Sequence, residues 1–180
     1  MNEVELIRAQ LALERQHAAA VSHALSVAVA QSRDRTESVD RFRETSVDYL
    51  VWALSRFEER EQVFLDLIRE RPQLSDGAEE VFALHGTSRE ALAKLEAALR
   101  AGSDARAAPQ WADFLQFFEG AWRTRRDALD KLFAQHARIT DWRAMSAIDA
   151  DSIFAERERY SRVRESLPVG IELPSTTSRV

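Results

Sequence analysis

Residues 49–64, YLVWALSRFEEREQVF, decide the fold class of this chain. Apolar side chains recur here about every three to four residues, which is the period of an α-helix with one buried face. The same period continues on both sides and predicts a helix over 38–71, which Pro72 ends. The apolar stripe of this helix contains Val47, Leu50, Leu54, Phe57, Leu65 and Ile68.

Further helices are predicted along most of the chain. They run over 2–32, from Ser75 or Asp76 to Gly102, from Pro109 onward, and over 141–166 with a break near 149–151. With only 5 glycines and 4 prolines in 180 residues, helix is favoured over sheet. We therefore expect an all-α fold, an up-down-up-down four-helix bundle with an additional C-terminal helical segment. Residues 1–166 would form this single domain, and 167–180 an extended or flexible tail.

Composition excludes several classes of protein. The net charge of −5 argues against a nucleic-acid-binding surface, which usually needs a basic face. The chain contains no cysteine, so disulfides and thiolate metal sites are excluded. No apolar run approaches the roughly 20 residues needed to cross a bilayer, and the N-terminus lacks the pattern of a signal peptide. We expect a cytoplasmic protein that binds neither nucleic acid nor membrane.

Four polar residues occupy apolar stripes of four different predicted helices: Glu14, Glu61, His85 and Arg125. Charged side chains are rarely buried unless they are paired or bound to a metal. With alternating helix directions and a rise of about 1.5 Å per residue, they fall within roughly 10 Å of one level, together with Glu58. This convergence predicts a shared interior site.

Two physical solutions fit such a site. In one, Glu14, Glu58, Glu61 and His85, with His17 as a fifth ligand, hold non-haem iron or manganese. In the other, Arg125 neutralises the glutamates in a buried ion-pair network, and no metal is bound. A small-molecule pocket, with Arg125 facing an anionic ligand, is a third alternative.

The chain resembles a hemerythrin-like (HHE-type) domain over residues 6–133. The similarity is carried by LALERQHAAAVSHAL (11–25), YLVWALSRFEEREQVF (49–64), EEVFALHGTSREALAKL (79–95) and FEGAWRTRRDALDKLF (118–133). That family binds two irons through five histidines and two carboxylates, for oxygen carriage or for oxygen, redox or iron sensing. The resemblance implies that His17 or His23 is the first-helix ligand, and that Glu58 and His85 are ligands of the second and third helices.

The chain departs from the family pattern at four positions. Leu54, Arg89 and Trp122 stand where histidine ligands would be expected, and Asp127 projects away from the apolar face. A divergent member with an altered site is therefore expected. Two functions stay open: a metal protein for oxygen or redox sensing or storage, and a non-enzymatic interaction or scaffold bundle closed by Arg125.

The sequence also predicts two surface features, a second apolar helix face and a charged helix face. A second apolar face on the helix over 38–71, formed by Tyr49, Trp52, Val63 and Leu67, is expected to contact the C-terminal helix or form a homodimer interface. The charged run ERERYSRVRE, residues 156–165, is expected to be a solvated helix face.

Overall fold

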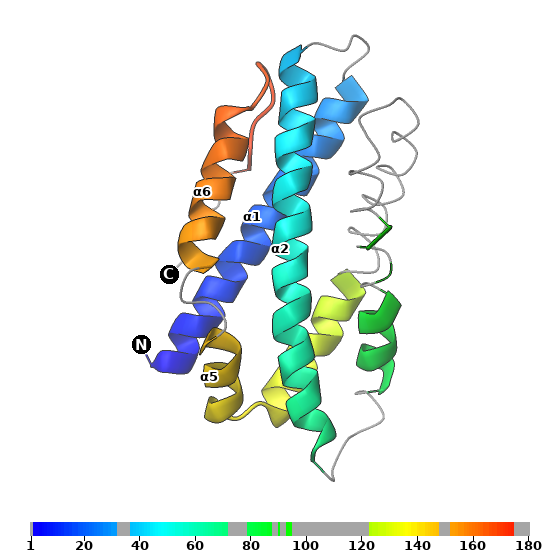
Figure 1. Ribbon diagram of the computed structural model, residues 1–180, viewed down its shortest axis with the longest axis vertical. Helices are drawn as coiled ribbons and strands as arrows, with labels where there is room; N and C mark the ends of the chain where they lie inside the picture. The colour runs from blue at the N-terminus through cyan, green and yellow to red at the C-terminus, as the bar shows by residue number, and fades with distance from the viewer. Residues whose placement is uncertain are drawn as a thin grey trace. The chain divides into compact units, whose positions relative to one another are not determined.

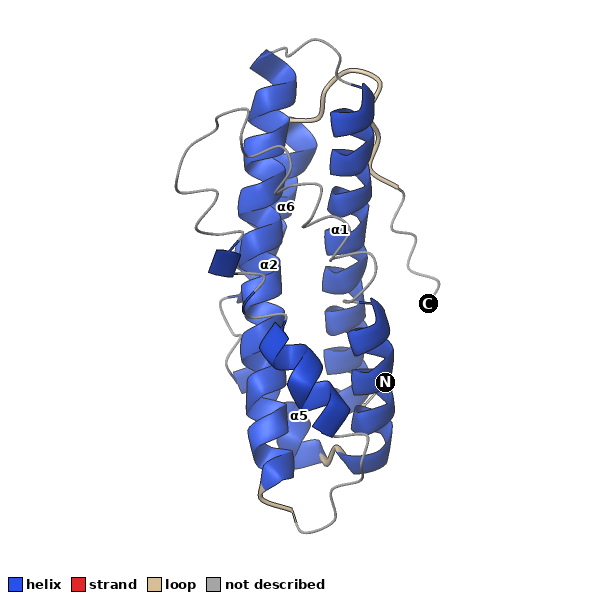
Figure 2. Cartoon of the chain, turned by 90° about the vertical axis from the view of Figure 1, so that its right-hand side faces the viewer, coloured by secondary structure: helices blue, strands red, loops and turns tan. Residues whose placement is uncertain are grey.

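The computed structural model describes residues 2–31, 37–71, 79–87, 90, 93–94, 123–147 and 152–174. Across these ranges the backbone is helix or loop and contains no strand (Figure 2), which confirms the all-α class. The chain divides into two compact units. Unit 1 is Met1–Ala53 with Asp149–Val180, and unit 2 is Leu54–Ile148. The up-down-up-down bundle of residues 1–166 stays a prediction.

Two long helices come first. Helix α1 spans Glu3–Gln31 and helix α2 spans Glu37–Arg69, so α2 begins in unit 1 and ends in unit 2. Asn2 caps α1: its Oδ1 accepts from the backbone N–H of Glu5 at 2.9 Å, and the Glu5 carboxylate accepts from the Asn2 N–H at 2.7 Å. This reciprocal capping box satisfies two donors that a helix start leaves unpaired.

Unit 1 is built from α1, the first half of α2 and helix α6, Ser152–Glu165, which lies beside both (Figure 1). Small and branched apolar residues let the helices approach closely. The buried apolar residues are Ala18, Ala20, Val21, Ala24, Leu25, Ala28, Phe42, Val47, Tyr49, Leu50, Ala53, Val163 and Ile171.

The chain turns back directly after α6. The Ile171 N–H donates to the Pro168 carbonyl at 3.1 Å, and Gly170 has φ of 85°. A positive φ at the third residue of a turn is the type II geometry that favours glycine. The turn buries Ile171, so the first part of the predicted 167–180 tail is anchored on unit 1. Residues 175–180 lie outside the described ranges.

Unit 2 contains the second half of α2, helical residues 79–87 and 123–136, and helix α5, Ile139–Ala147. Phe64, Phe133 and Trp142 form an aromatic row, with ring centroids 4.1 Å and 5.1 Å apart. Arg71 binds both oxygens of Asp141 at 2.5 Å, which holds the end of α2 to the start of α5. The remaining buried apolar residues are Leu54, Phe57, Leu65, Ile68, Val81, Leu129, Leu132 and Met145.

The helix predictions agree closely with these elements. All six stripe residues predicted for α2 are buried, and α5 and α6 lie on either side of the break predicted near 149–151. Within the described part of the chain, no helix is long and apolar enough to cross a membrane. The predicted caps Ser75 and Asp76, the stop at Gly102 and the start at Pro109 lie outside the described ranges.

Candidate metal centre

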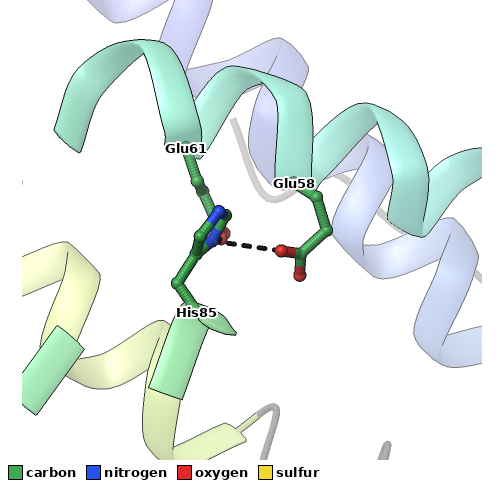
Figure 3. Close-up of side chains that lie close together, drawn as sticks. All are labelled: Glu58, Glu61 and His85. Atoms are coloured by element: carbon green, nitrogen blue, oxygen red, sulfur yellow. Dashed lines mark hydrogen bonds and ion pairs between the residues drawn. The ribbon is translucent and has the colours of Figure 1, made fainter. Parts of the chain in front are cut away.

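The interior polar cluster of unit 2 contains Glu58 and Glu61 from α2 and His85 from helical residues 79–87. All three are buried, and one ligand atom from each lies within 4.8 Å of the others. His85 Nδ1 is 3.1 Å from Glu58 Oε2 and 3.4 Å from Glu61 Oε2 (Figure 3). Glu58 and Glu61 are three residues apart on one helix, which places both side chains on the same face.

The other nitrogen of the imidazole has its own partner, which sequence reasoning missed. His85 Nε2 lies 3.2 Å from Gln62 Oε1, and the Gln62 amide nitrogen donates to Asp66 at 2.8 Å. Because the Asp66 carboxylate only accepts, this contact orients the Gln62 oxygen toward His85. The His85 Nε2–H therefore donates to Gln62, and Nδ1 faces the two glutamates. Gln62 follows Glu61 directly, but nothing in the spacing marks it as a partner of a histidine on another helix.

Arg125, on helical residues 123–136, is the cation of the cluster. Its side chain is 1% exposed; Nη2 donates to Glu61 Oε2 at 2.5 Å, and Nη1 contacts Glu58 Oε1. The guanidinium thus contacts both carboxylates. Within the described ranges, the buried Arg125 Nε and Glu58 Oε2 make no hydrogen bond.

The cluster contains two carboxylates, Glu58 and Glu61, that are buried away from water. Burial raises the pKa of Glu58, the charges of Arg125 and His85 lower it, and the charge of Glu61 raises it; the net direction is upward. Two ionised carboxylates at this spacing require positive charge nearby. Arg125 supplies one positive charge while it contacts both carboxylates, and a proton on His85 Nδ1 would supply the second.

The structure places the other predicted site residues in unit 1. Glu14 is buried on α1, and Gln10 donates to its Oε1 at 2.8 Å. His17 Nδ1 lies 2.7 Å from Glu156 Oε1, while His23, the other first-helix candidate, is exposed. The membership of Glu14 and His17 in one site with the unit 2 cluster stays a prediction.

The burial of Glu156 was not predicted, because the charged run 156–165 was expected to be a solvated helix face. This expectation is wrong for Glu156, which is 1% exposed and accepts a hydrogen bond from Tyr49 Oη at 2.9 Å on the oxygen that faces His17. Tyr160 stacks on His17 with ring centroids 3.8 Å apart. Helix α6 carries the carboxylate inward because Val163, seven residues on, is buried on the same face.

Two further predictions concern the outer face of α2 and Asp127. In unit 1, the Tyr49 and Trp52 part of the second apolar face of α2 contacts α6: Tyr49 donates to Glu156, and the Arg159 guanidinium lies 5.4 Å from the centroid of the Trp52 ring. The homodimer interface and the contacts of Val63 and Leu67 stay predictions. Asp127 is exposed and pairs with Arg126, as its projection predicts. Arg89 and Trp122 lie outside the described ranges.

Comparison of the chain with known protein families, with curated proteins and with solved structures gives no match.

Proposed function

We propose that unit 2 binds a transition-metal ion, non-haem iron or manganese, through Glu58, Glu61 and His85. In this proposal the chain is a divergent hemerythrin-like bundle with an altered centre, used for oxygen or redox sensing or for storage. The supporting observation is that His85 Nδ1 faces two carboxylate oxygens while Nε2 is held by the Gln62 carbonyl oxygen.

This arrangement matches the way proteins prepare a histidine ligand. A metal-bound imidazole usually donates its second N–H to a carbonyl or carboxylate, which sets the tautomer and the ring orientation. Gln62, oriented by Asp66, has this role toward His85. One imidazole and two carboxylates form a nitrogen and oxygen donor set of the kind that suits iron and manganese. Three protein ligands leave coordination positions for water or oxygen.

Elemental analysis of the full chain after growth with added iron and manganese tests this function. We expect about one bound ion per chain, and loss of that ion in both Glu61→Gln and His85→Gln. The matched control is Asp127→Asn, which removes an exposed carboxylate of the same unit and should keep the metal. Wild-type protein that stays free of iron and manganese under these conditions would contradict the proposal.

A second function is favoured by a different observation, the contact of Arg125 with both glutamates. With His85 protonated, two positive charges balance two negative charges, so the cluster is neutral without a metal. The chain would then be a non-enzymatic interaction or scaffold bundle with no cofactor. This alternative expects chelators to leave the free energy of unfolding unchanged.

A further inference from the structure

Arg125 and a metal ion would need the same oxygen atom. Glu61 Oε2 accepts from Arg125 Nη2 at 2.5 Å, and it is also the oxygen that lies 3.4 Å from His85 Nδ1. An ion bound between His85 and Glu61 would therefore meet a guanidinium on its own ligand. Arg125 is 1% exposed, so water does not screen that charge.

The charges of the cluster show why both cations do not fit together. Glu58 and Glu61 contribute two negative charges, which a divalent ion balances when His85 is the neutral ligand. If Arg125 stays in place, one uncompensated positive charge remains in a buried site, and this is strongly disfavoured. If the guanidinium leaves the carboxylates and reaches solvent, the metal-bound cluster is neutral and no buried charge stays uncompensated.

We propose that Arg125 is a displaceable counter-ion of the metal site, an inference that rests on the metal-binding function proposed above. In the metal-free protein the guanidinium neutralises the carboxylates and keeps the site stable. Metal binding displaces the guanidinium from Glu61 Oε2, and the lost ion pairs lower the affinity for the metal. The contacts of Arg125 therefore regulate how tightly the site holds a divalent ion.

Metal affinity of variants at position 125 tests this competition. The dissociation constant for Mn²⁺ is measured on the full chain by the electron paramagnetic resonance signal of free Mn²⁺. Arg125→Gln removes the charge and should tighten binding by at least about tenfold, because the repulsion and the competing ion pairs are both lost. Arg126→Gln, which removes the neighbouring and more exposed charge, should leave the constant within about twofold.

A measurement on the wild-type chain covers the case in which Arg125→Gln does not fold. The Arg125 Nε–H signal, assigned in a ¹⁵N spectrum by its loss in Arg125→Lys, is followed during titration with diamagnetic Zn²⁺. Zn²⁺ accepts the same nitrogen and oxygen donors. Displacement predicts that this signal shifts and exchanges faster with water in proportion to bound Zn²⁺.

The outcomes separate this inference from the proposed function. Equal Mn²⁺ affinity in wild type and Arg125→Gln, or an unchanged Nε–H signal while Zn²⁺ binds, would overturn the displacement and leave the metal site standing. Tight binding in Arg125→Gln with none in wild type would show that Arg125 blocks the site, and it would contradict both the displacement and metal binding by the natural chain. Absence of binding in both proteins would overturn both.

Discussion

The role of the glutamates and the histidine in the interior cluster depends on Arg125. Two buried glutamates and a histidine resemble a metal site, and the same residues with Arg125 form a balanced ion-pair cluster. The same residues surround the site in both arrangements. What differs is whether a metal ion or the guanidinium neutralises the carboxylates. The stability of the metal-free protein therefore depends strongly on the guanidinium.

Replacing Arg125 with alanine should destabilise the metal-free protein by about 3–5 kcal/mol, because two buried carboxylates lose their shared cation. Urea unfolding followed by circular dichroism, in the presence of a chelator, measures this free energy. The control Arg126→Ala should change it by less than about 0.5 kcal/mol, since that side chain is partly exposed. A loss below about 1 kcal/mol for Arg125→Ala would show that the contacts do not stabilise the fold.

At the scale of elements, α6 is attached to α1 and α2 by a polar contact. Glu156 is the buried centre of that contact, with Tyr49 and His17 bound to one of its oxygens. Apolar packing alone would let α6 rotate or slide, whereas a buried carboxylate with two fixed partners specifies one position. This contact also affects the chemistry of the tyrosines.

Alkaline titration should detect the contact through the only two tyrosines of the chain. Burial raises the pKa of Tyr49 far above its ordinary value, with the charge and hydrogen bond of Glu156 adding to it, and burial raises the pKa of Tyr160 as well. We expect tyrosinate absorbance to appear above pH 10 in the folded protein. Glu156→Gln should lower the pKa of Tyr49, because the neighbouring negative charge is removed.

The same shift makes stability depend on pH. A group whose pKa is raised by folding stabilises the protein fully below its unfolded value, about 10 for tyrosine, and this contribution is lost as the pH rises through the folded value. Unfolding should therefore become easier above pH 10, and less steeply so in Tyr49→Phe. The variant Tyr160→Phe shows which of the two tyrosinate absorbance changes belongs to Tyr160 and which to Tyr49. The control is Asp48→Asn, which removes an exposed contact with Arg159. Tyr49 ionising at its ordinary pKa in the folded wild type would contradict the buried contact.

At the scale of the whole molecule, each of the two units contains a polar cluster. The Glu58, Glu61, His85 and Arg125 contacts all lie in unit 2, and the His17, Tyr49, Glu156 and Tyr160 contacts all lie in unit 1. A ligand that binds one cluster should therefore protect its own unit most strongly.

Saturating Zn²⁺ should slow amide hydrogen exchange in the second half of α2 and in residues 79–87 and 123–136. A ligand at about 100 times its dissociation constant stabilises the state that binds it by about 2.7 kcal/mol. Residues 3–25 of α1 and the whole of α6 should change much less if local openings dominate exchange there. If Zn²⁺ slows amide exchange in His85→Gln as much as in the wild type, the ion binds elsewhere. Protection confined to unit 1 would indicate a site at His17 and Glu156.

Within the described ranges, the sequence by itself determined the helices and most of their buried faces. All six stripe residues that helical periodicity predicted for α2 are buried, although the buried Phe42 and Phe64 were not among them. Periodicity also placed Glu14, Glu61, His85 and Arg125 in the apolar stripes of their own helices, as their burial confirms. This succeeds because the direction of a side chain around a regular helix depends only on its position along that helix.

Only the tertiary structure decided which polar groups meet. The contact of Arg125 with both glutamates, the contact of His85 with Gln62, and the burial of Glu156 against Tyr49 depend on distances between helices. Periodicity contains no information about those distances, because they are set by side-chain packing between helices and by the loops that join them. For this reason the sequence alone predicts that the charged run 156–165 is solvated. The burial of Glu156 becomes visible only when the neighbouring helices are placed.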